Sequence, residues 1–546
     1  MLRIVSPPTY HRRAAISVLK ECPACGPAVK AHVLPNALVL STSPLLQDLA
    51  LDSLLALLEQ IVASNAVEFP ELLGMLRERL QEDKIGKHAI YNLAECIAVI
   101  TATTSPDNRQ GVISESLSLL EQNRGSTPSD DNELQRVQLA LLVSGDLGRM
   151  VDLSTLSDGV TERLKSIYME YFVSPSEELK HAAAYSLGRA SVGSQNVFLP
   201  IIVKTLDEKN KKKQYLLLSA LREYIKCSYR QSGGEGIAST LPVILPHLEQ
   251  HCRDAEEGVR TMVAECMGSL TVMSPAAMLK KLQELQEGHC EINAPDGTVD
   301  PEDTKSKANA LVCWTVATSL KLAIAGKVAP NELTKYMPGY LKLLQQKELS
   351  VRNAALLMVY SAVHHMPQVV AGLMKDEIMP SLYEVAELKL ERKVDLGPFT
   401  HTVDDALPLR KAALSIFATC LEKLPASMDI ASFMPVLAKA LGDVEDIQLH
   451  AHHIVSSMCL RQPTYLVAAI ETFVEPLEKT IHKKQGQKTG TELERLNDWI
   501  KSSLRAMLAL SRLDGAMNAR KFAEFYSRTT GNAKFRPVLD ALEEER

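Results

Sequence analysis

The sequence has few aromatic residues: phenylalanine, tryptophan and tyrosine make up only 5% of 546 residues, although 46% of the residues are hydrophobic. The interior must therefore be built from leucine, alanine, valine, isoleucine and methionine. These side chains suit close packing of helix on helix better than the formation of sheets. The composition predicts an all-α protein.

A strong excess of charge of one sign is also missing. Sixty basic residues stand against 66 acidic ones, which gives a formal net charge of -6. Such a small net charge does not indicate binding to nucleic acid or to an anionic membrane surface. No uninterrupted apolar run reaches the roughly 18 residues that span a bilayer, and the N-terminal MLRIVSPPTYHRR lacks the apolar core of a secretory signal. We expect an intracellular protein without nucleic-acid or membrane partners.

A disulfide framework is not indicated either. Ten cysteines are scattered along the chain, most of them inside helical patterns, as at Cys96, Cys266, Cys313 and Cys420. Such positions favour reduced, buried thiols over paired cysteines.

What the sequence does contain is a recurring pattern: a polar start, an aliphatic residue, usually with a basic neighbour, and then an Ala-rich apolar helix. The aliphatic anchors of the five clearest copies are Leu179, Val259, Val351, Leu409 and Leu449. Their intervals lie near multiples of about 40 residues, the length of HEAT or armadillo helical pairs. Each pair buries its apolar stripe only by stacking on its neighbours. The pattern predicts an α-solenoid of about twelve helical pairs.

Two intervals are longer than this period allows, and an insertion in a stacked repeat must leave the stack as a loop. The first surplus falls on the acidic residues 291–307, where we expect a disordered loop. The second lies between Val351 and Leu409. It contains side chains that alternate around Gly397-Pro398, which predicts a β-hairpin near residues 393–403.

Helix starts carry their own signals. Four Ser-Pro pairs each place a capping hydroxyl before a proline suited to the first turn: Ser43-Pro44, Ser105-Pro106, Ser174-Pro175 and Ser274-Pro275. Glu177 is expected to complete a capping box with Ser174. Residues 481–492 are expected to form an exposed loop between terminal helices.

Catalytic motifs are weak throughout. The GGEG stretch at 233–236 lacks the Lys-Ser/Thr of a phosphate loop and fits an inter-helix loop. Cys22 and Cys25 have CxxC spacing without further ligands nearby. The adjacent carboxylates Asp404 and Asp405 point apart and are expected to cap the helix from Leu407. We predict no catalytic residue, no metal and no cofactor.

Several histidines were weighed as metal ligands, but they lack acidic partners at ligand spacing, so surface or repeat-interface positions are expected. They are His364, His365, His450, His452 and His453.

Residues 392–414, RKVDLGPFTHTVDDALPLRKAAL, closely resemble the C-terminal region of the cullin-associated, neddylation-dissociated family, also described as TATA-binding-protein-interacting proteins. Further stretches between about residue 85 and residue 515 also resemble the family, and they occur in the same order as in its members. They include SPSEELKHAAAYSLGRASVG (174–193), KKQYLLLSALREYI (212–225), HCRDAEEGVRTMVAECMGSLT (251–271), VRNAALLMVYSAVHHMP (351–367) and FVEPLEK (473–479).

The resemblance implies a HEAT solenoid that binds an unneddylated cullin with its RING partner and displaces the adaptor with its substrate receptor, without covalent catalysis. It implies that the hairpin carries out the displacement and that the protein works in cytoplasm and nucleus. The matching residues are Val394, Asp395, Leu396, Gly397, Pro398, Phe399, Thr400 and His401.

The resemblance also suggests an organisation. We expect weakly matched helical repeats at 1–84, central repeats at 85–345 and C-terminal repeats with the hairpin at 346–546. Family members are about twice as long, which suggests either a fragment or the product of a split gene whose N-terminal half is a separate chain. Two other functions stay open on the residues alone: a generic HEAT scaffold of the nuclear-transport or phosphatase kind, and a metal-dependent enzyme that uses the cysteine pair and the histidines.

Overall fold

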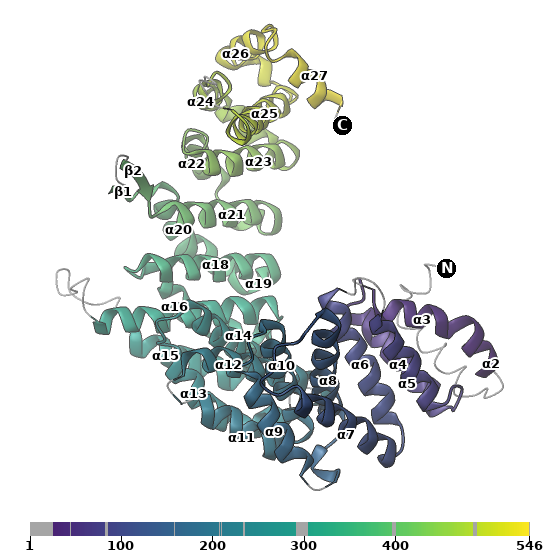
Figure 1. Cartoon of the computed structure of the whole chain (residues 1–546). Coiled ribbons are helices and arrows are strands. Elements are labelled where there is room, and N and C mark those ends of the chain that lie inside the picture. Colours follow the sequence, from purple (N-terminus) through teal and green to yellow (C-terminus); the bar gives the residue numbers. More distant parts are fainter. Residues whose placement is uncertain are drawn as a thin grey trace. The chain divides into compact units, whose positions relative to one another are not determined.

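The computed structural model describes residues 26–544 except 44, 82–85, 158, 207, 209, 233–234, 291–303, 396–399 and 484–488. Helices fill most of this part of the chain, and its sheet is one two-stranded hairpin. The predicted all-α solenoid with an inserted hairpin is confirmed (Figure 1). The chain divides into two compact units, Met1–Cys266 and Met267–Arg546. The domain boundaries predicted at residues 84 and 345 stay predictions.

The first unit stacks its helices in two layers, in which alternate helices contact one another. One layer consists of α4 (Asp48–Ala63), α6 (Lys87–Thr103), α8 (Asp131–Met150), α10 (Glu177–Gly193) and α12 (Lys211–Ser232). The other consists of α5 (Phe69–Glu78), α7 (Pro106–Gln122), α9 (Val160–Tyr171), α11 (Gln195–Leu206) and α13 (Glu235–His251). Before them come α2 (Gly26–Ala28), η3 (Val29–Val33) and α3 (Leu34–Ser41), and the short helices η4 (Arg79–Gln81) and η5 (Leu153–Thr155) lie between them.

The division between the units falls inside α14 (Glu257–Met273), and the second unit repeats the two-layer stack. One layer has α16 (Thr304–Ala325), α18 (Leu349–His365), α21 (Leu407–Lys423), α23 (Glu445–Arg461) and α25 (Thr491–Ser511). The other has α15 (Pro275–His289), α17 (Pro330–Leu341), α19 (Pro367–Val370), α20 (Met379–Glu387), α22 (Ile430–Ala440), α24 (Pro463–Ile481) and α26 (Arg520–Thr530). Shorter elements are η6 (Lys342–Gln345), η7 (Ala371–Leu373), η8 (Met374–Ile378), η9 (Pro425–Ser427), η10 (Ala516–Asn518) and α27 (Arg536–Glu544).

The predicted anchors fall on one helix position, with one correction. Leu179, Val259, Val351 and Leu409 are each the third residue of their helix and are almost completely buried. In α23 the third residue is Ile447, which is buried, whereas the predicted Leu449 is only half-buried. The prediction was wrong by two residues because each helical residue turns the side chain by about 100°, so Leu449 faces away from the position that the other anchors share.

Helix caps are confirmed at one of the four predicted sites. Ser274 precedes α15 without a side-chain cap hydrogen bond, and the helix after Ser43 begins only at Asp48. Ser105 accepts a hydrogen bond from the Asn108 amide at the start of α7. Before α10 the capping residue is Ser176, whose hydroxyl accepts from the Leu179 amide. The expected capping box between Ser174 and Glu177 is therefore wrong by two residues.

Glycine permits a close approach of α10 and α12 in the first unit. A Cβ atom at Gly188 would overlap the carbonyl oxygen of Ala220, whereas one at Gly111 in α7 would meet nothing within 4 Å. The two sites therefore differ in whether backbone from a neighbouring helix fills the space beside the glycine.

We expect Gly188→Ala to destabilise the first unit by about 1–3 kcal/mol, because backbone must move to admit the methyl group. Gly111→Ala is the matched control, and it should be neutral or stabilising by up to about 1 kcal/mol, since alanine favours helix. Urea unfolding of both variants measures the difference. Equal stability of the two would contradict the close packing of α10 on α12.

The helix Lys305–Ala325 within α16 is long and apolar enough, by length and composition, to cross a membrane. Half of the most apolar stretch of this helix is buried inside the protein, and the helix contacts α15 and α18. A core helix in a repeat stack passes the same test, so we assign α16 to the packed interior.

Several predicted features lie partly or wholly outside the described residues. These are the pair Cys22 and Cys25, residues 291–303 of the acidic insertion, Gly233 and Gly234, and residues 484–488 between α24 and α25. Where the acidic insertion is described, residues 304–307 begin α16. Of the expected glycine loop, Glu235 and Gly236 instead begin α13. Of the expected loop at 481–492, Ile481 ends α24 and Thr491 begins α25.

Candidate interaction site at the hairpin

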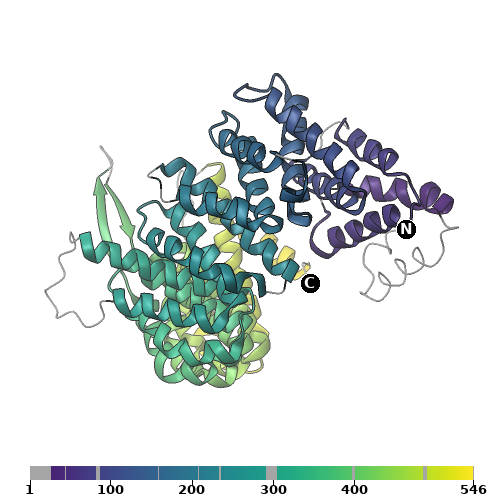
Figure 2. The ribbon, with the colours of Figure 1, turned by 90° about the horizontal axis from the view of Figure 1, so that it is seen from below.

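The hairpin stands between α20 and α21 and projects from the helical layers of the second unit (Figure 2). Its strands are β1 (Glu391–Asp395) and β2 (Thr400–Asp404), which pair antiparallel with Val394 opposite His401. An isolated two-stranded hairpin is at best marginally stable in water. Contacts at its base must therefore hold it.

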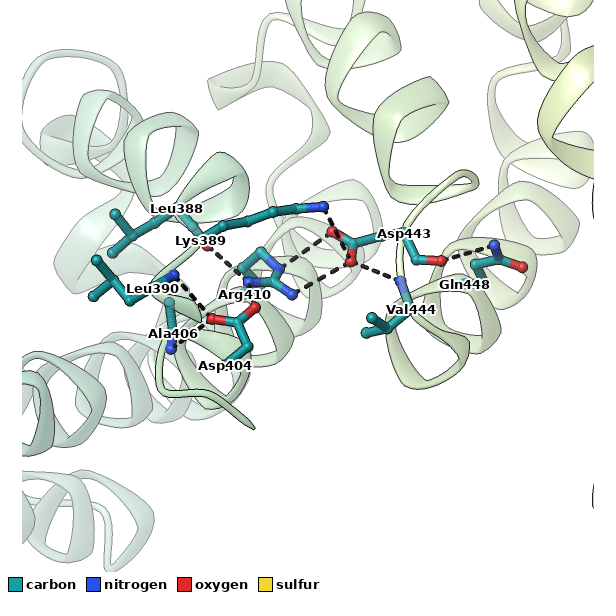
Figure 3. A network of polar contacts seen from close by, with 9 residues as sticks. All are labelled: Leu388, Lys389, Leu390, Asp404, Ala406, Arg410, Asp443, Val444 and Gln448. Carbon is teal, nitrogen blue, oxygen red and sulfur yellow. Dashed lines mark hydrogen bonds and ion pairs between the residues drawn. The ribbon is translucent and has the colours of Figure 1, made fainter. Parts of the chain in front are cut away.

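Arg410 in the first turn of α21 supplies the central contact at the base (Figure 3). Its side chain is 1% exposed. The guanidinium Nη1 donates to the Leu388 carbonyl oxygen at 2.8 Å and to Asp404 Oδ2 at 2.6 Å. The chain entering the hairpin and the chain leaving it are thus both attached to one buried cation.

Asp404 ends β2 and closes the hairpin from the other side. Its Oδ1 accepts from the backbone amides of Leu390 at 3.0 Å and Ala406 at 3.1 Å. The Asp405 amide also donates to the Leu390 carbonyl oxygen at 3.1 Å, which extends the strand pairing by one residue. Both oxygens of Asp404 are therefore used to fix the base of the hairpin.

The same arginine reaches the following repeat. Its Nη2 lies 3.3 Å from Asp443 Oδ1, and its Nε lies 3.3 Å from Asp443 Oδ2. Asp443 precedes α23, where its carboxylate accepts from the Val444 amide at 2.6 Å and its carbonyl accepts from the Gln448 side chain at 2.8 Å. Lys389 lies 3.7 Å from the same carboxylate. A local hairpin is thereby linked to the repeat that follows it.

Asp404 and Asp405 serve different arginines. Asp405 forms an exposed ion pair with Arg392 of β1 at 2.6 Å, whereas Asp404 faces Arg410. The prediction that the two carboxylates point apart is confirmed. The expected capping of the next helix is corrected, because Ala406 is the N-cap residue of α21 and no side chain caps that helix.

We expect the base of the hairpin to weaken in acid. Burial of Asp404 opposes its ionisation, but hydrogen bonds from Leu390, Arg410 and Ala406 outweigh it and hold the pKa of this carboxyl below its ordinary 3.8. A lowered pKa contributes stability that is complete above 3.8 and is lost as the pH falls through the lower folded value. Hydrogen exchange of the β1 and β2 amides, measured downward from about pH 5, should show protection falling below about pH 3.8. Asp404→Asn should remove this dependence, and an unchanged dependence would contradict the assignment.

Only some of the predicted site residues lie in the described part of the hairpin. Val394 and Asp395 end β1, and Thr400 and His401 begin β2. Leu396, Gly397, Pro398 and Phe399 lie outside the described residues. Arg410 and Asp443 were not predicted. The sequence shows a basic residue beside the aliphatic anchor at Leu409-Arg410, but only the structure shows that Arg410 is buried and which groups it contacts.

A family model described as "TATA-binding protein interacting (TIP20)" matches residues 370–530, which contain the hairpin, Arg410 and Asp443. The Cullin-associated NEDD8-dissociated protein 1 of Arabidopsis thaliana is 34% identical over 509 residues, covering 91% of this chain. The chain is similar to the cullin-associated NEDD8-dissociated proteins over most of its length. The predicted resemblance is confirmed.

The match covers 39% of the length of the Arabidopsis family member. Another family member, from Emericella nidulans, is named "Cullin-associated NEDD8-dissociated protein 1, C-terminal part"; it is 26% identical over 58% of this chain and 28% of its own length. Among solved structures, yeast importin-beta (Kap95p) aligns with a TM-score of 0.48 and 13% identity over 94% of this chain and 61% of that chain.

The relatives are named as cullin-associated proteins. Within the part of the chain that the structure describes, the histidines and cysteines weighed as ligands do not gather into a site. His364, His365, His450 and His453 are exposed. His452 is buried between α23 and α25, with Nδ1 3.1 Å from Ser502 Oγ, and burial lowers its pKa to about 4. Among the described residues no group of histidine, cysteine and acidic side chains could hold a metal ion.

The cysteine prediction holds where the structure describes it. Cys96, Cys266, Cys313 and Cys420 are buried free thiols. Burial raises the pKa of Cys266 and of Cys420 to about 12, which keeps these thiols protonated and unreactive.

Proposed function

We propose that this chain is a non-enzymatic, cullin-binding regulator of cullin-RING ubiquitin ligases. It binds an unneddylated cullin together with its RING protein and displaces the adaptor and its substrate receptor. The observation that carries this proposal is the hairpin held by Arg410 inside the region matched by the family model. The relatives' names support association with a cullin.

The physical basis of displacement is mutual weakening. If this chain lowers the adaptor's affinity for cullin by a given ratio, the adaptor lowers the affinity of this chain for cullin by the same ratio. The reason is that the two binding equilibria share one thermodynamic cycle. A stiff projection placed where the adaptor binds provides that coupling without covalent chemistry. Arg410 supplies the stiffness, since it joins both ends of the hairpin to the next repeat.

A pull-down with purified cullin–RING complexes tests the proposal. The immobilised chain should retain the unneddylated complex and retain little of the same complex after neddylation. Adaptor loaded on the cullin beforehand should appear in the unbound fraction when the chain is added. Failure to retain unneddylated cullin would reject the function.

We further propose that a separate chain with the N-terminal half is a partner and that the complex works in cytoplasm and nucleus. The relative named as a C-terminal part supports the first point. Co-elution of the two chains in size-exclusion chromatography tests the first point, and imaging of the tagged chain tests the second. Independent elution of the chains, or a signal confined to another compartment, would reject the corresponding point.

A further inference from the structure

Four helices of one layer end on a common edge of the second unit. They are α16, α18, α21 and α23, and each is followed by a turn into the other layer. Basic side chains lie at or just after all four ends, and these side chains are exposed. We call them the basic edge: Lys327, His364, His365, Lys423 and Arg461. Stacking of the repeats thus gathers basic residues that are far apart in the sequence.

Lys327 has a backbone conformation that is unusual for a residue with a side chain. Its φ is 62°, in the left-handed region that glycine adopts freely. This conformation is unfavourable for other residues, and residues held in it gather at functional sites. Burial, and then the charges of His364 and Lys327, lower the pKa of His365. A lysine therefore stands where glycine would be more favourable, and it adds to the positive charge around His365.

The positive charge extends to the following repeats. Glu422 at the end of α21 pairs with Lys423 at 3.0 Å. A hydrogen bond from Lys423, and the charges of Lys423, Arg461 and His364, hold the pKa of the Glu422 carboxyl below its ordinary range. This carboxylate can offset only one of the cations. In the described part of the chain, Lys327 and Arg461 form no salt bridge with another residue.

The helix dipole alone does not account for this arrangement. The partial negative charge at a helix C-terminus stabilises a cation in the last turn, and Lys439 of α22 and Arg528 of α26 occupy such positions. Those two side chains pair with acids on neighbouring helices, Glu387 and Glu478. The basic edge differs from them, because its cations from successive repeats crowd together with little compensation.

Apolar side chains are exposed beside the cations. Leu460, directly before Arg461, is 88% exposed, and Tyr465 in the first turn of α24 is 40% exposed. A nucleic-acid backbone or a lipid headgroup presents phosphates, which pair with cations but do not bury an aliphatic side chain. A protein segment with carboxylates and a large apolar side chain matches both kinds of residue. The chemistry of the edge therefore favours an acidic protein segment.

The basic edge lies away from the hairpin. α21 begins shortly after the hairpin at Leu407 and ends at Lys423, so its 17 residues separate the two by about 25 Å. Figure 1 shows the hairpin and α19 on opposite sides of the second unit, and α19 follows the two histidines of the basic edge. A partner bound at this edge therefore leaves the hairpin accessible.

We infer that the basic edge binds an acidic segment of a partner protein, with carboxylates on Lys327, Lys423 and Arg461 and a large apolar side chain against Leu460. This inference goes beyond the proposed function and does not depend on it. Exposed ion pairs contribute little individually, so the segment must contact several repeats at once. Adjacent packed helices lie about 8–10 Å apart. Four helices therefore extend over about 24–30 Å, which an extended segment of about eight or nine residues spans.

Binding of synthetic peptides to the full chain tests the inference. The probe is a fluorescein-labelled peptide of about ten residues, in which Glu and Asp surround a central pair of leucines. Its control has Gln and Asn in place of the acids and keeps the leucines. Fluorescence anisotropy should show saturable binding of the acidic peptide that weakens as sodium chloride rises from about 50 to 300 mM. The neutral peptide, a single-stranded oligonucleotide and vesicles containing phosphatidylserine should each bind at least about tenfold more weakly.

Two double substitutions separate the edge from a general effect of charge. Lys327→Gln with Arg461→Gln removes two cations of the basic edge. Lys439→Gln with Arg528→Gln removes two cations that also lie in last turns and are 64% and 63% exposed. We expect the first pair to weaken binding of the acidic peptide by about tenfold and the second by less than about twofold. Leu460→Ser should weaken it by about threefold. Circular dichroism and thermal melting check that all variants fold alike.

Each outcome supports or overturns the inference. Wild-type affinity after the first double substitution, an equal loss in the control pair, or equal binding of the neutral peptide would overturn it. Tighter binding of the oligonucleotide or of the vesicles would assign the edge to nucleic acid or to a membrane instead. Self-association of the wild-type chain that the first pair abolishes, seen by light scattering, would assign the edge to a second copy and overturn a separate partner. The cullin pull-down should give the same result with both pairs, so failure of the proposed function is distinguishable from failure of this inference.

Discussion

Replacing residues 393–402 by a short Gly/Ser loop is expected to abolish adaptor displacement and to leave cullin binding largely intact. The described residues of the replaced segment contribute little to the core, because Lys393, Asp395, His401 and Thr402 are exposed and Val394 is half-buried. The Arg410 contacts to Leu388, Asp404 and Asp443 all lie outside the segment and can survive the change. What disappears is the projection itself.

The expected size of the effect follows from the coupling between the two binding equilibria. Without the projection, adaptor release should fall at least about 100-fold, a coupling of about 2.7 kcal/mol. Cullin affinity should stay within about threefold. Energy transfer between labelled cullin and labelled adaptor measures the release rate, and titration of labelled cullin measures the affinity.

The matched control replaces the other insertion, residues 291–303, by a Gly/Ser loop. Release should then proceed at the wild-type rate, because that insertion does not belong to the hairpin. Undiminished release in the 393–402 variant would show that the hairpin does not displace the adaptor. Loss of cullin binding in that variant would instead assign the hairpin to the main cullin contact.

Arg410→Met should produce the largest loss of stability among single substitutions near the site. Methionine keeps most of the apolar stem but leaves the Asp404 carboxylate without its cation and the Asp443 carboxylate with only Lys389 at 3.7 Å. These two carboxylate side chains are only 14% and 8% exposed. Removing one partner of a buried ion pair typically costs about 3–5 kcal/mol. We expect a loss of that size in the opening free energy of α21 amides, measured by hydrogen exchange, and slower adaptor release because the hairpin loses its anchor.

Arg352→Met is the matched control for this substitution. Arg352 occupies the same position in α18, directly after the buried anchor Val351, but its partner Glu384 is 64% exposed. An exposed ion pair contributes about 1 kcal/mol or less. Equal losses in the two variants would mean that the network around Arg410 has no special role in holding the hairpin.

Local pattern was sufficient to predict the helical layers and the hairpin. Helix and strand differ in the period of their apolar residues, and that period is written in the chain itself. The anchors Leu409 and Val351 and the alternation at residues 393–403 could therefore be found without coordinates. The same reasoning placed Leu449 two residues away from the true anchor, since a short apolar segment fits more than one helical register.

Contacts between distant residues could not be predicted in this way. Arg410 and Asp443 are 33 positions apart, and nothing in either segment states that a loop of the next repeat returns to the first turn of α21. The role of Asp404 was also decided by contacts that the sequence does not show. Its position before α21 suggested a helix cap, whereas its partners are Arg410 and the backbone amides of Leu390 and Ala406.

By itself, then, the sequence determined the helical repeat, the existence and place of the hairpin, and the alternation of apolar and charged residues along its strands. Only the tertiary structure decided how the hairpin is held, through the contacts of Arg410 with Leu388, Asp404 and Asp443. The physical reason is that periodicity acts between near neighbours in the chain, whereas a buried ion pair forms only when stacking brings separate repeats within hydrogen-bonding distance.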